Sequence, residues 1–560
     1  MRLSPPRAAP ILPPMRVVRA LAVGAAFLAV CWAVGGWGLP SAERSAYYPP
    51  HASVEYARAG VAGLYVTGPA KSFHPEEASV LGALAGMRPA QRDFNPHNFD
   101  GPTLHLYAVG AGLALAQRLH WIPASRSADY YLERPEAAAR LYRTGRMVSA
   151  AWAALLLVVL VLGSPSAGLG AALMLAATPL FLACAASLVP DMAGTCLATL
   201  AALAAAGARA PGRWKCLALG LLAGAAASAR YSGGLMLIPV LWASAGPGQR
   251  RGERWGALVA AGVGAAAGFL AGTPYALLAP GEFLHGLRLA LAPGGLPPGL
   301  RSEGLGSAWR QHLDSALLVG CGLPFTLFLA GILGCLVDLN ARRRSLLLSL
   351  AVWVALMLAS RANFARHSLL ALPLAATLAA EGWWLLLQRG GAERGWPIRI
   401  ALAVALLPQL AVGLAFVLVM RGPDTRLLAA RAITAWPAAT RVRLLQRPAF
   451  TTPPLDVTRY EVRVGPVDED TLRVRAPQAL VVSEFELRSL ARLEARRPGL
   501  ARVARTLLSP GDTLRAGSYA WVGQEIRRPA GLAGWSRATR GEPRELVMLH
   551  PTIYLWRRIR

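Results

Sequence analysis

The chain consists mainly of long apolar runs separated by short polar segments that contain arginine. The first run, 18–39, is apolar over about twenty residues, which is long enough to cross a bilayer and too long for a typical signal-peptide core. We expect it to be an uncleaved first membrane span. The pattern predicts ten further spans, at 146–163, 168–186, 191–208, 215–229, 232–246, 255–273, 313–337, 345–359, 368–387 and 399–420. The predicted fold is therefore an α-helical polytopic membrane protein with about eleven transmembrane helices.

Two helical segments between the first and second spans differ from the rest. Residues 76–87 carry apolar residues on one side, and 104–119 is apolar but short and includes His105, Gln117 and Arg118. We predict that both are juxtamembrane helices that lie in the membrane interface. Counting 104–119 as a span would invert the orientation of every later span.

The distribution of arginine predicts which ends of the spans face the cytoplasm. Arg2, Arg7 and Arg16 precede the first span and Arg19 lies at its start, so the positive-inside rule places the N-terminus in the cytoplasm and the loop 40–145 outside. With 104–119 in the interface, four later basic clusters also fall on the cytoplasmic side. They are Arg209, Arg213 and Lys215; Arg250, Arg251 and Arg254; Arg342, Arg343 and Arg344; and Arg389, Arg394 and Arg399.

The two ends of the chain have a different character. Residues 1–17 are rich in proline and arginine, and we expect them to be a disordered cytoplasmic N-terminus. Residues 18–420 form the predicted membrane domain, whereas 421–560 have fewer apolar residues. Within that last part, 479–483 and 552–556 are typical of strands and 485–497 of an amphipathic helix. We therefore predict a small extracytoplasmic α/β domain.

Composition agrees with a membrane protein and excludes two other classes. Hydrophobic residues make up 54% of the chain, charged residues 16%, and the mean hydropathy is +0.40. The net charge of +28 comes from dispersed arginines without a nucleic-acid motif, so we expect no nucleic-acid partner. The six cysteines lie in or beside apolar runs, without metal spacing, and none follows Cys335, which excludes a disulfide framework.

The residues that could carry chemistry gather at the predicted outer ends of the spans. The loop 40–145 contains Ser72-Phe73-His74-Pro75-Glu76-Glu77 and a second cluster at 93–102. Charges at span ends are functional candidates because their burial is costly. The candidates are Glu76, Glu77, Asp100, Asp191, Arg230 with Tyr231, Arg361, and Arg366 with His367. They come from different spans but share one side, so they could form one pocket.

Each candidate also has a purely structural interpretation. Glu76 and Glu77 could begin a helix, where acids favour the positive end of the dipole, and Asp191 could be an N-cap. The arginines could extend their guanidinium groups from span ends towards water. His74 and His97 are more typical of hydrogen-bonded loop residues than of metal ligands. The acids could bind a divalent metal ion through oxygen, but no residue spacing requires one.

Paired acids and arginines at a membrane surface suit sugar transfer from a polyprenyl phosphate. A carboxylate can deprotonate the acceptor hydroxyl as it attacks the anomeric carbon. Arginines can neutralise the departing phosphate with bidentate hydrogen bonds. The apolar spans can hold the lipid tail.

These motifs resemble, in order, those of the GT-C glycosyltransferases, specifically the group of protein O-mannosyltransferases and aminoarabinose transferases. His74-Pro75-Glu76-Glu77 is similar to the family's HPDE signature and 95–102 to the segment that follows it. Pro190-Asp191 resembles a conserved PD pair. The remaining matches are 228–233, which is similar to TKYSG, Pro274-Tyr275, and Arg366-His367. The resemblance extends over 18–420.

The resemblance implies a GT-C fold, a lipid-monophosphate sugar as donor and activity on the outer face of the bacterial inner membrane. It implies that Glu76 is the general base, that Glu77 and Asp191 orient the acceptor or a metal, and that Arg230 and Arg366 hold the donor phosphate. Glu77 and Asp100 become the candidate metal ligands. The other implied substrate-binding residues are His97, Asp100, Tyr231, Tyr275 and His367.

The sequence also departs from the family pattern at several positions. Glu76 stands in place of an aspartate, Arg230 of a lysine, and His367 of a tyrosine. Gly101 occupies a position where some members have lysine, which weakens the analogy with aminoarabinose transfer. The C-terminal α/β domain matches no part of the family.

Two other functions remain open at the level of sequence. The chain could be a non-catalytic transporter or flippase for a lipid or lipid-linked sugar, although transporters typically place charges near the bilayer midplane and often contain internal repeats. It could instead be a scaffold whose outer domain binds a partner. The acceptor of a transferase could be a lipid, a glycan or a protein.

Overall fold

The structure is a computed structural model of the 560-residue chain. It describes residues 13–49, 68–125, 127–164, 167–208, 211–246, 250–291, 325–336, 338–359, 364–389, 410–445, 450–465, 477–491, 498–508, 514–516, 519–526 and 549–558, together with 400, 404 and 407. The protein is mostly helical, with a small sheet near the C-terminus, as the pattern predicted.

Three described helices are long and apolar enough to cross a membrane. They are α1 (Pro13–Val34), α7 (Pro135–Gly163) and α13 (Arg251–Gly272). A fourth candidate is the pair α8 (Gly168–Ala176) and α9 (Pro179–Ala185), which is bent by 76°. These helices make the chain a membrane protein, and the predicted count of about eleven spans is not confirmed.

Several predicted spans are shortened or interrupted for identifiable reasons. The run 168–186 breaks where Pro179 begins a new helix, because proline cannot donate the hydrogen bond that would continue the first one. The run 232–246 begins as a 3-10 helix, and α10 (Asp191–Ala206) has only 16 residues. Residues 410–421 are helical and overlap the second half of the predicted span 399–420. Most of 313–337 lies outside the described residues.

Two helices begin earlier than the sequence pattern predicted. Helix α1 starts at Pro13, so 13–17 are helical although we expected disorder up to residue 17. Proline is compatible with the first turn of a helix, whose N–H groups have no intrahelical partner. Helix α7 starts at Pro135 rather than at 146, which places Arg146 inside a helix of 29 residues.

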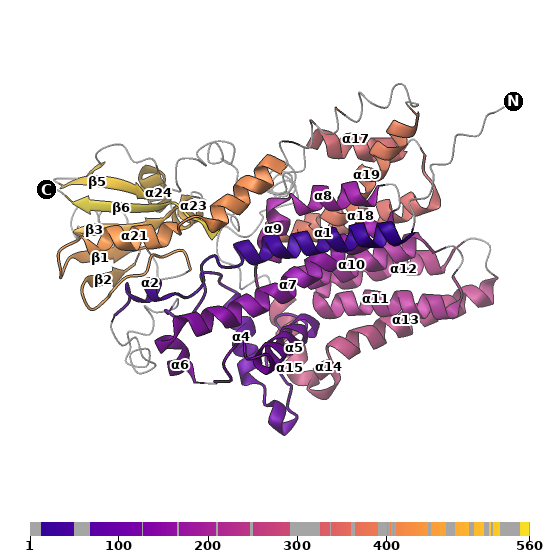
Figure 1. Ribbon diagram of the computed structural model, residues 1–560, viewed down its shortest axis with the longest axis horizontal. Coiled ribbons are helices and arrows are strands. Elements are labelled where there is room, and N and C mark those ends of the chain that lie inside the picture. Colours follow the sequence, from indigo (N-terminus) through magenta and orange to yellow (C-terminus); the bar gives the residue numbers. More distant parts are fainter. Residues whose placement is uncertain are drawn as a thin grey trace.

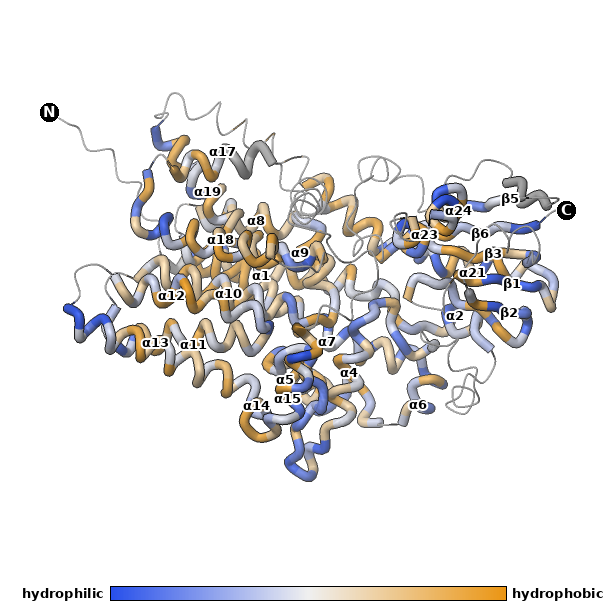
Figure 2. The backbone as a smooth tube through the Cα atoms, turned by 180° about the vertical axis from the view of Figure 1, so that it is seen from behind, coloured by the Kyte–Doolittle hydropathy of each residue, from blue (hydrophilic) through white to orange (hydrophobic). Residues whose placement is uncertain are grey.

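Small residues allow the helices of the membrane domain to pack closely. Helix α11 (Arg213–Ala229) lies against α13, and a Cβ atom added to Gly220 or Gly224 would lie 2.0 Å from a carbonyl oxygen of α13. Such close contact between backbones is typical of helices in membranes. Figure 1 shows α1, α7, α10, α11 and α13 running side by side. The apolar positions of this bundle appear as a continuous group in Figure 2.

The other helices pack against these five or lie in the segments that connect them. They are α2 (Ala42–Ser45), α4 (Glu77–Gly86), α5 (Leu104–Arg118), α6 (Ala128–Glu133), α12 (Leu237–Ser244), α14 (Tyr275–Leu278), α15 (Pro280–Leu291), α17 (Phe325–Leu336), α18 (Ala341–Ala359) and α19 (Leu372–Arg389). Three 3-10 helices are η2 (Pro89–Gln91), η3 (Tyr231–Met236) and η6 (Ala365–Leu370). The two predicted juxtamembrane helices correspond to α4 and α5, and α5 has only 15 residues.

The C-terminal part forms a six-stranded mixed sheet in the order β2-β1-β3-β6-β5-β4. Its strands are β1 (Arg441–Leu444), β2 (Glu461–Val464), β3 (Ala479–Ser483), β4 (Leu514–Ala516), β5 (Tyr519–Ile526) and β6 (Ile553–Arg558). Its helices are α21 (Thr425–Thr434), α23 (Glu484–Ala491) and α24 (Pro498–Leu508). Strands β3 and β6 and helix α23 occur where the sequence predicted two strands and an amphipathic helix.

Both faces of this sheet are covered by helices. In β3, Leu480 and Val482 pack with α23 and α24, whereas Ala479 and Val481 pack with α21. Alternate residues of a strand point to opposite faces, so this central strand is buried on both sides. Figure 1 shows the sheet at one end of the bundle, next to α2.

Candidate active site

The predicted base, Glu76, lies at the surface of the membrane domain and forms an ion pair. It is the N-cap residue of α4, and its carboxylate lies 2.6 Å from the guanidinium of Arg366 in η6. The two residues are 290 positions apart in the sequence. The Glu76 side chain is 41% exposed, so a substrate can reach this carboxylate.

A second pair of the same kind joins α10 to the end of α11. Asp191, the first residue of α10, receives a hydrogen bond from Arg230, which follows the last residue of α11. Pro190 occupies the N-cap position of α10, so Asp191, at the first helical position, is not the N-cap residue considered from the sequence. Gly194 makes room for this arginine, because a Cβ added there would lie 2.7 Å from the Cβ of Arg230.

The two pairs share one electrostatic environment. The carboxylate of Asp191 interacts electrostatically with Arg366, His367 and His74 as well as with Arg230. Glu76 and Arg366 likewise interact with His74. The site therefore brings together the 72–77 loop, α10, the α11–η3 junction and η6, as expected from the sequence. Arg361, another candidate, lies outside the described residues.

His74 contacts the backbone of Glu76 within the 72–77 loop. Its Nδ1 atom accepts a hydrogen bond from the backbone N–H of Glu76 at 3.3 Å. Burial lowers the pKa of His74 below the ordinary value of 6.5, and this effect outweighs the opposite influence of Glu77 and Glu76. The imidazole is therefore neutral at pH 7, which agrees with an Nδ1 atom that accepts a hydrogen bond.

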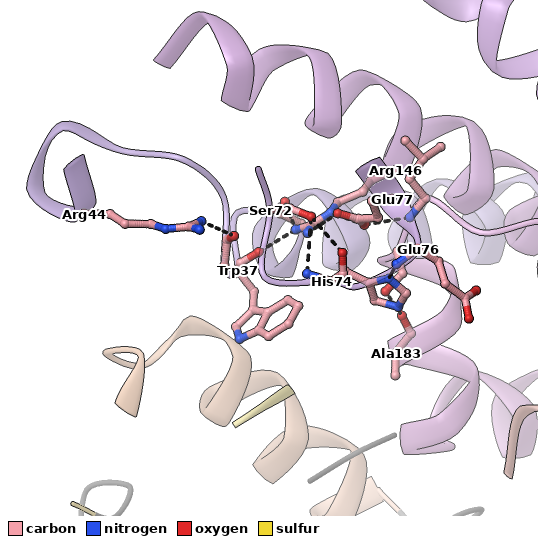
Figure 3. A network of polar contacts seen from close by, with 12 residues as sticks. Trp37, Arg44, Ser72, His74, Glu76, Glu77, Arg146 and Ala183 are labelled. Atoms are coloured by element: carbon pink, nitrogen blue, oxygen red, sulfur yellow. Dashed lines mark hydrogen bonds and ion pairs between the residues drawn. The ribbon is translucent and has the colours of Figure 1, made fainter. Parts of the chain in front are cut away.

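Glu77 lies beneath the site and is completely buried (Figure 3). Its two oxygens accept hydrogen bonds from Nε and a terminal nitrogen of Arg146, each at 2.8 Å, and the backbone N–H of Leu188 adds a third at 2.8 Å. Burial alone raises the pKa of Glu77, but Arg146 outweighs that effect and holds it below the usual value of 4.5. Glu77 is an ionised anchor between α4, α7 and the loop before α10.

Arg146 was not among the residues singled out from the sequence. It also donates to the carbonyl oxygens of Gly35 at 2.9 Å and Trp37 at 2.6 Å, which ties α7 to the end of α1 (Figure 3). A signal was present in the pattern, because Arg146 follows Ala138 and Tyr142 on the buried face of α7. A charged residue on such a face requires a buried partner.

The second cluster, 93–102, is anchored beside the site rather than within it. Asn95 and His97 both contact a carboxylate oxygen of Glu282 in α15, at 3.1 and 3.0 Å. The backbone N–H of Phe94 donates to the hydroxyl of Tyr275 at 3.0 Å. The contacts of Asn95 and His97 with Glu282 therefore hold the 93–102 loop against α15.

Tyr231 links this anchored loop to the two ion pairs. Its hydroxyl donates to the carbonyl oxygen of Phe99 at 3.0 Å, and it interacts electrostatically with Asp100. It directly follows Arg230 in the chain. Asp100 thus lies on the side of the site formed by Tyr231, and its backbone N–H donates to Asn98.

The two candidate metal ligands, Glu77 and Asp100, are held in different surroundings. Glu77 is enclosed by Arg146 and Leu188, whereas Asp100 lies near Tyr231. Among the residues that the structure describes, no group of three or more His, Cys, Asp and Glu side chains could hold a metal ion. Glu76, Glu77 and Asp191 each have an arginine partner.

Comparison with known proteins gives a distant structural likeness. The chain is similar to a crystal structure of ArnT from Cupriavidus metallidurans in the apo state, with a TM-score of 0.44 and 13% identity over 85% of this chain and 94% of that one. It is also similar to ArnT from Cupriavidus metallidurans bound to undecaprenyl phosphate, with a TM-score of 0.43 and 13% identity over 86% and 95%. No family model and no curated protein matches the sequence.

Proposed function

We propose that the protein is a membrane glycosyltransferase that transfers a sugar from a polyprenyl phosphate to an acceptor hydroxyl at the outer face of the membrane. The observation that carries the proposal is the pairing of Glu76 with Arg366 and of Asp191 with Arg230 in one electrostatic environment. Transfer from a lipid phosphate needs both signs of charge, a base for the acceptor and cations for the departing phosphate.

The exposure of the carboxylates supports Glu76 as the base. Glu76 is 41% exposed, whereas Glu77 is fully buried and its oxygens already accept three hydrogen bonds. Glu76 therefore takes the proton of the acceptor hydroxyl as the oxygen attacks the anomeric carbon. Glu77 has a positioning role, because its ion pair fixes the residue that precedes α4.

Arg366 and Arg230 stabilise the leaving group. When the bond between the anomeric carbon and the phosphate oxygen breaks, the electron pair stays on the phosphate, which gains negative charge. Guanidinium groups have five N–H donors and bind phosphate oxygens in a bidentate manner. Phosphate binding then partly replaces the present carboxylate partners of the two arginines, which leaves Glu76 available as base.

The environment of the site fits a substrate that is half lipid. The ion pairs lie beside apolar helices that can contact a polyprenyl chain, while Glu76 faces solvent. We assign the N-terminus to the cytoplasm and the site and C-terminal sheet to the outer side of a bacterial inner membrane, on the basis of the arginine distribution. His97, Tyr231 and Tyr275 border the acceptor side in this proposal.

The test follows the donor in membranes that contain the full-length chain. A panel of labelled polyprenyl-phosphate sugars is supplied, and release of free polyprenyl phosphate is measured together with transfer of label. We expect one donor to be consumed, and the variant Arg230→Met to raise KM for that donor by about tenfold or more. The matched control is Arg254→Met, at an exposed position of α13. Movement of intact labelled donor across the bilayer, without release of phosphate, would identify a transporter instead.

A further inference from the structure

The strongest unassigned feature outside the two ion pairs is a stack of three side chains around Phe73. The ring of Phe73 is 1% exposed, and the guanidinium carbons of Arg44 and Arg426 lie 3.8 and 3.9 Å from its centroid. Two guanidinium groups at such distances cannot occupy the same face of a ring, so they lie on opposite faces. Both arginines are completely buried.

The two arginines come from parts of the chain that are far apart. Arg44 belongs to α2, which follows the first span, and donates to the carbonyl oxygen of Gly38 and the hydroxyl of Tyr48. Arg426 belongs to α21, the helix that covers one face of the C-terminal sheet. The stack is therefore a contact between the C-terminal domain and the loop that carries Glu76.

Arg426 is firmly fixed on the side of the C-terminal domain. Asp424 accepts hydrogen bonds from its Nε at 2.8 Å and from a terminal nitrogen at 2.6 Å. The carbonyl oxygens of Phe450 and Leu549 accept two more, at 2.8 and 3.1 Å. This guanidinium thus joins three segments of the domain and presents its face to Phe73.

The path from Phe73 to the proposed base is only three residues long. The backbone N–H of Phe73 donates to the carbonyl oxygen of Gly38 at 2.8 Å, and the Glu76 N–H donates to His74 at 3.3 Å. A displacement of the Phe73 ring is therefore transmitted to Glu76. Because catalysis depends on the position of a base to within about 1 Å, such a displacement lowers the rate.

We propose that Arg426 is a positioning residue through which the C-terminal domain fixes the 72–77 loop and hence Glu76. The domain is then a working part of the transferase rather than a separate binding module. This inference rests on the proposed function for its effect on turnover, but the physical coupling it describes is independent of any substrate.

The first experiment needs no substrate. Hydrogen exchange of the 72–77 amides is measured in the full-length protein, as wild type, Arg426→Met, Arg426→Lys and Arg431→Met. We expect Arg426→Met to speed exchange of this loop by about thirtyfold, the factor that corresponds to a desolvated cation–π contact. Arg426→Lys keeps a cation and should recover part of the protection. Arg431→Met is the control, since Arg431 contacts Glu43 across the same two parts of the chain but at the exposed surface.

The second variant separates coupling from general loss of folding. Phe73→Leu keeps an apolar side chain but removes the aromatic ring, so it should reproduce the faster exchange. Adding Arg426→Met to Phe73→Leu should then cause no further increase. Exchange of the loop within twofold of the wild type in folded Arg426→Met, or full additivity of the two changes, would contradict the proposal.

Measurement of kcat and KM distinguishes a positioning role of Arg426 from a purely structural one. For the donor that the wild type consumes, Arg426→Met should lower kcat by roughly 10- to 100-fold and leave KM within about threefold. Unchanged kcat together with faster exchange would overturn the positioning role. If the wild type consumes no donor, the proposed function fails, while the exchange experiment still decides whether Arg426 fixes the loop.

Discussion

Replacement of Glu77 by glutamine tests the buried anchor beneath the site. The carboxylate is 0% exposed and its partner Arg146 is 1% exposed. Glutamine has nearly the same shape, but it removes the negative charge and directs an N–H group towards a guanidinium that can only donate. The change therefore isolates the electrostatic contribution of Glu77 from its packing.

We expect Glu77→Gln to lower the free energy of unfolding by about 3–5 kcal/mol, the magnitude found when one partner of a buried ion pair is removed. Three hydrogen bonds of 2.8 Å end on the Glu77 carboxylate, two of them from the buried guanidinium. Arg146 keeps its contacts with two carbonyl oxygens, which offset only part of the lost counter-charge. An exposed ion pair is worth only about 0–1 kcal/mol.

The same variant should change how stability depends on pH. The pKa of Glu77 is lower in the folded protein than its ordinary value of 4.5, so the unfolded chain binds its proton more readily. The stabilisation is complete above pH 4.5 and is lost as the pH falls below 4.5 through the lowered pKa. In Glu77→Gln this acid-dependent component should be missing.

The assay is equilibrium denaturation in mixed micelles at pH 7 and over an acid series. The matched control is Glu133→Gln, which removes a carboxylate whose ion pair with Arg134 is 70% and 55% exposed. If Glu77→Gln lowers the free energy of unfolding by less than about 1 kcal/mol, no more than the control does, this ion pair does not anchor the loop.

Three further predictions concern the surroundings of the site. Gly194→Ala should displace Arg230, since the new Cβ would lie 2.7 Å from the Cβ of Arg230, and KM for the donor should then rise about tenfold. The control Gly212→Ala adds a methyl group to open space and should leave KM unchanged. Burial lowers the pKa of His74 below 6.5, so the neutral ring contributes fully to stability above pH 6.5 and less as the pH falls towards the lowered pKa. Thermal unfolding of His74→Asn, measured over this pH range, should lack that decline. Glu282→Gln should weaken the attachment of the 93–102 loop, which limited proteolysis would detect as faster cleavage there; cleavage at the wild-type rate would contradict the anchoring role.

The hydrophobic pattern predicted the helical membrane domain and the small C-terminal α/β domain because both depend on local periodicity. The predicted number of spans is not confirmed among the described residues, where Pro179 divides one apolar run and α10 is only 16 residues long. Periodicity measures the length of an apolar run. It does not measure whether a helix remains straight across it.

The site was predicted in part for a similar reason. Glu76, Asp191, Arg230 and Arg366 were recognisable as charges at span ends, and the structure brings them together. Their pairing was not predictable, because Glu76 and Arg366 are separated by 290 positions and no local rule relates them. Arg426 was missed because its role arises from contact between two domains.

The central claim is that Glu76 is the base of a glycosyl transfer, and a comparison of Glu76→Gln with Glu76→Asp tests it most directly. Both variants are assayed with the donor that the wild type consumes, by release of polyprenyl phosphate and transfer of label. Glu76→Gln should lower kcat by about 10²- to 10⁴-fold, and Glu76→Asp, which keeps a carboxylate, should retain more activity. Full transferase activity in Glu76→Gln would contradict the account.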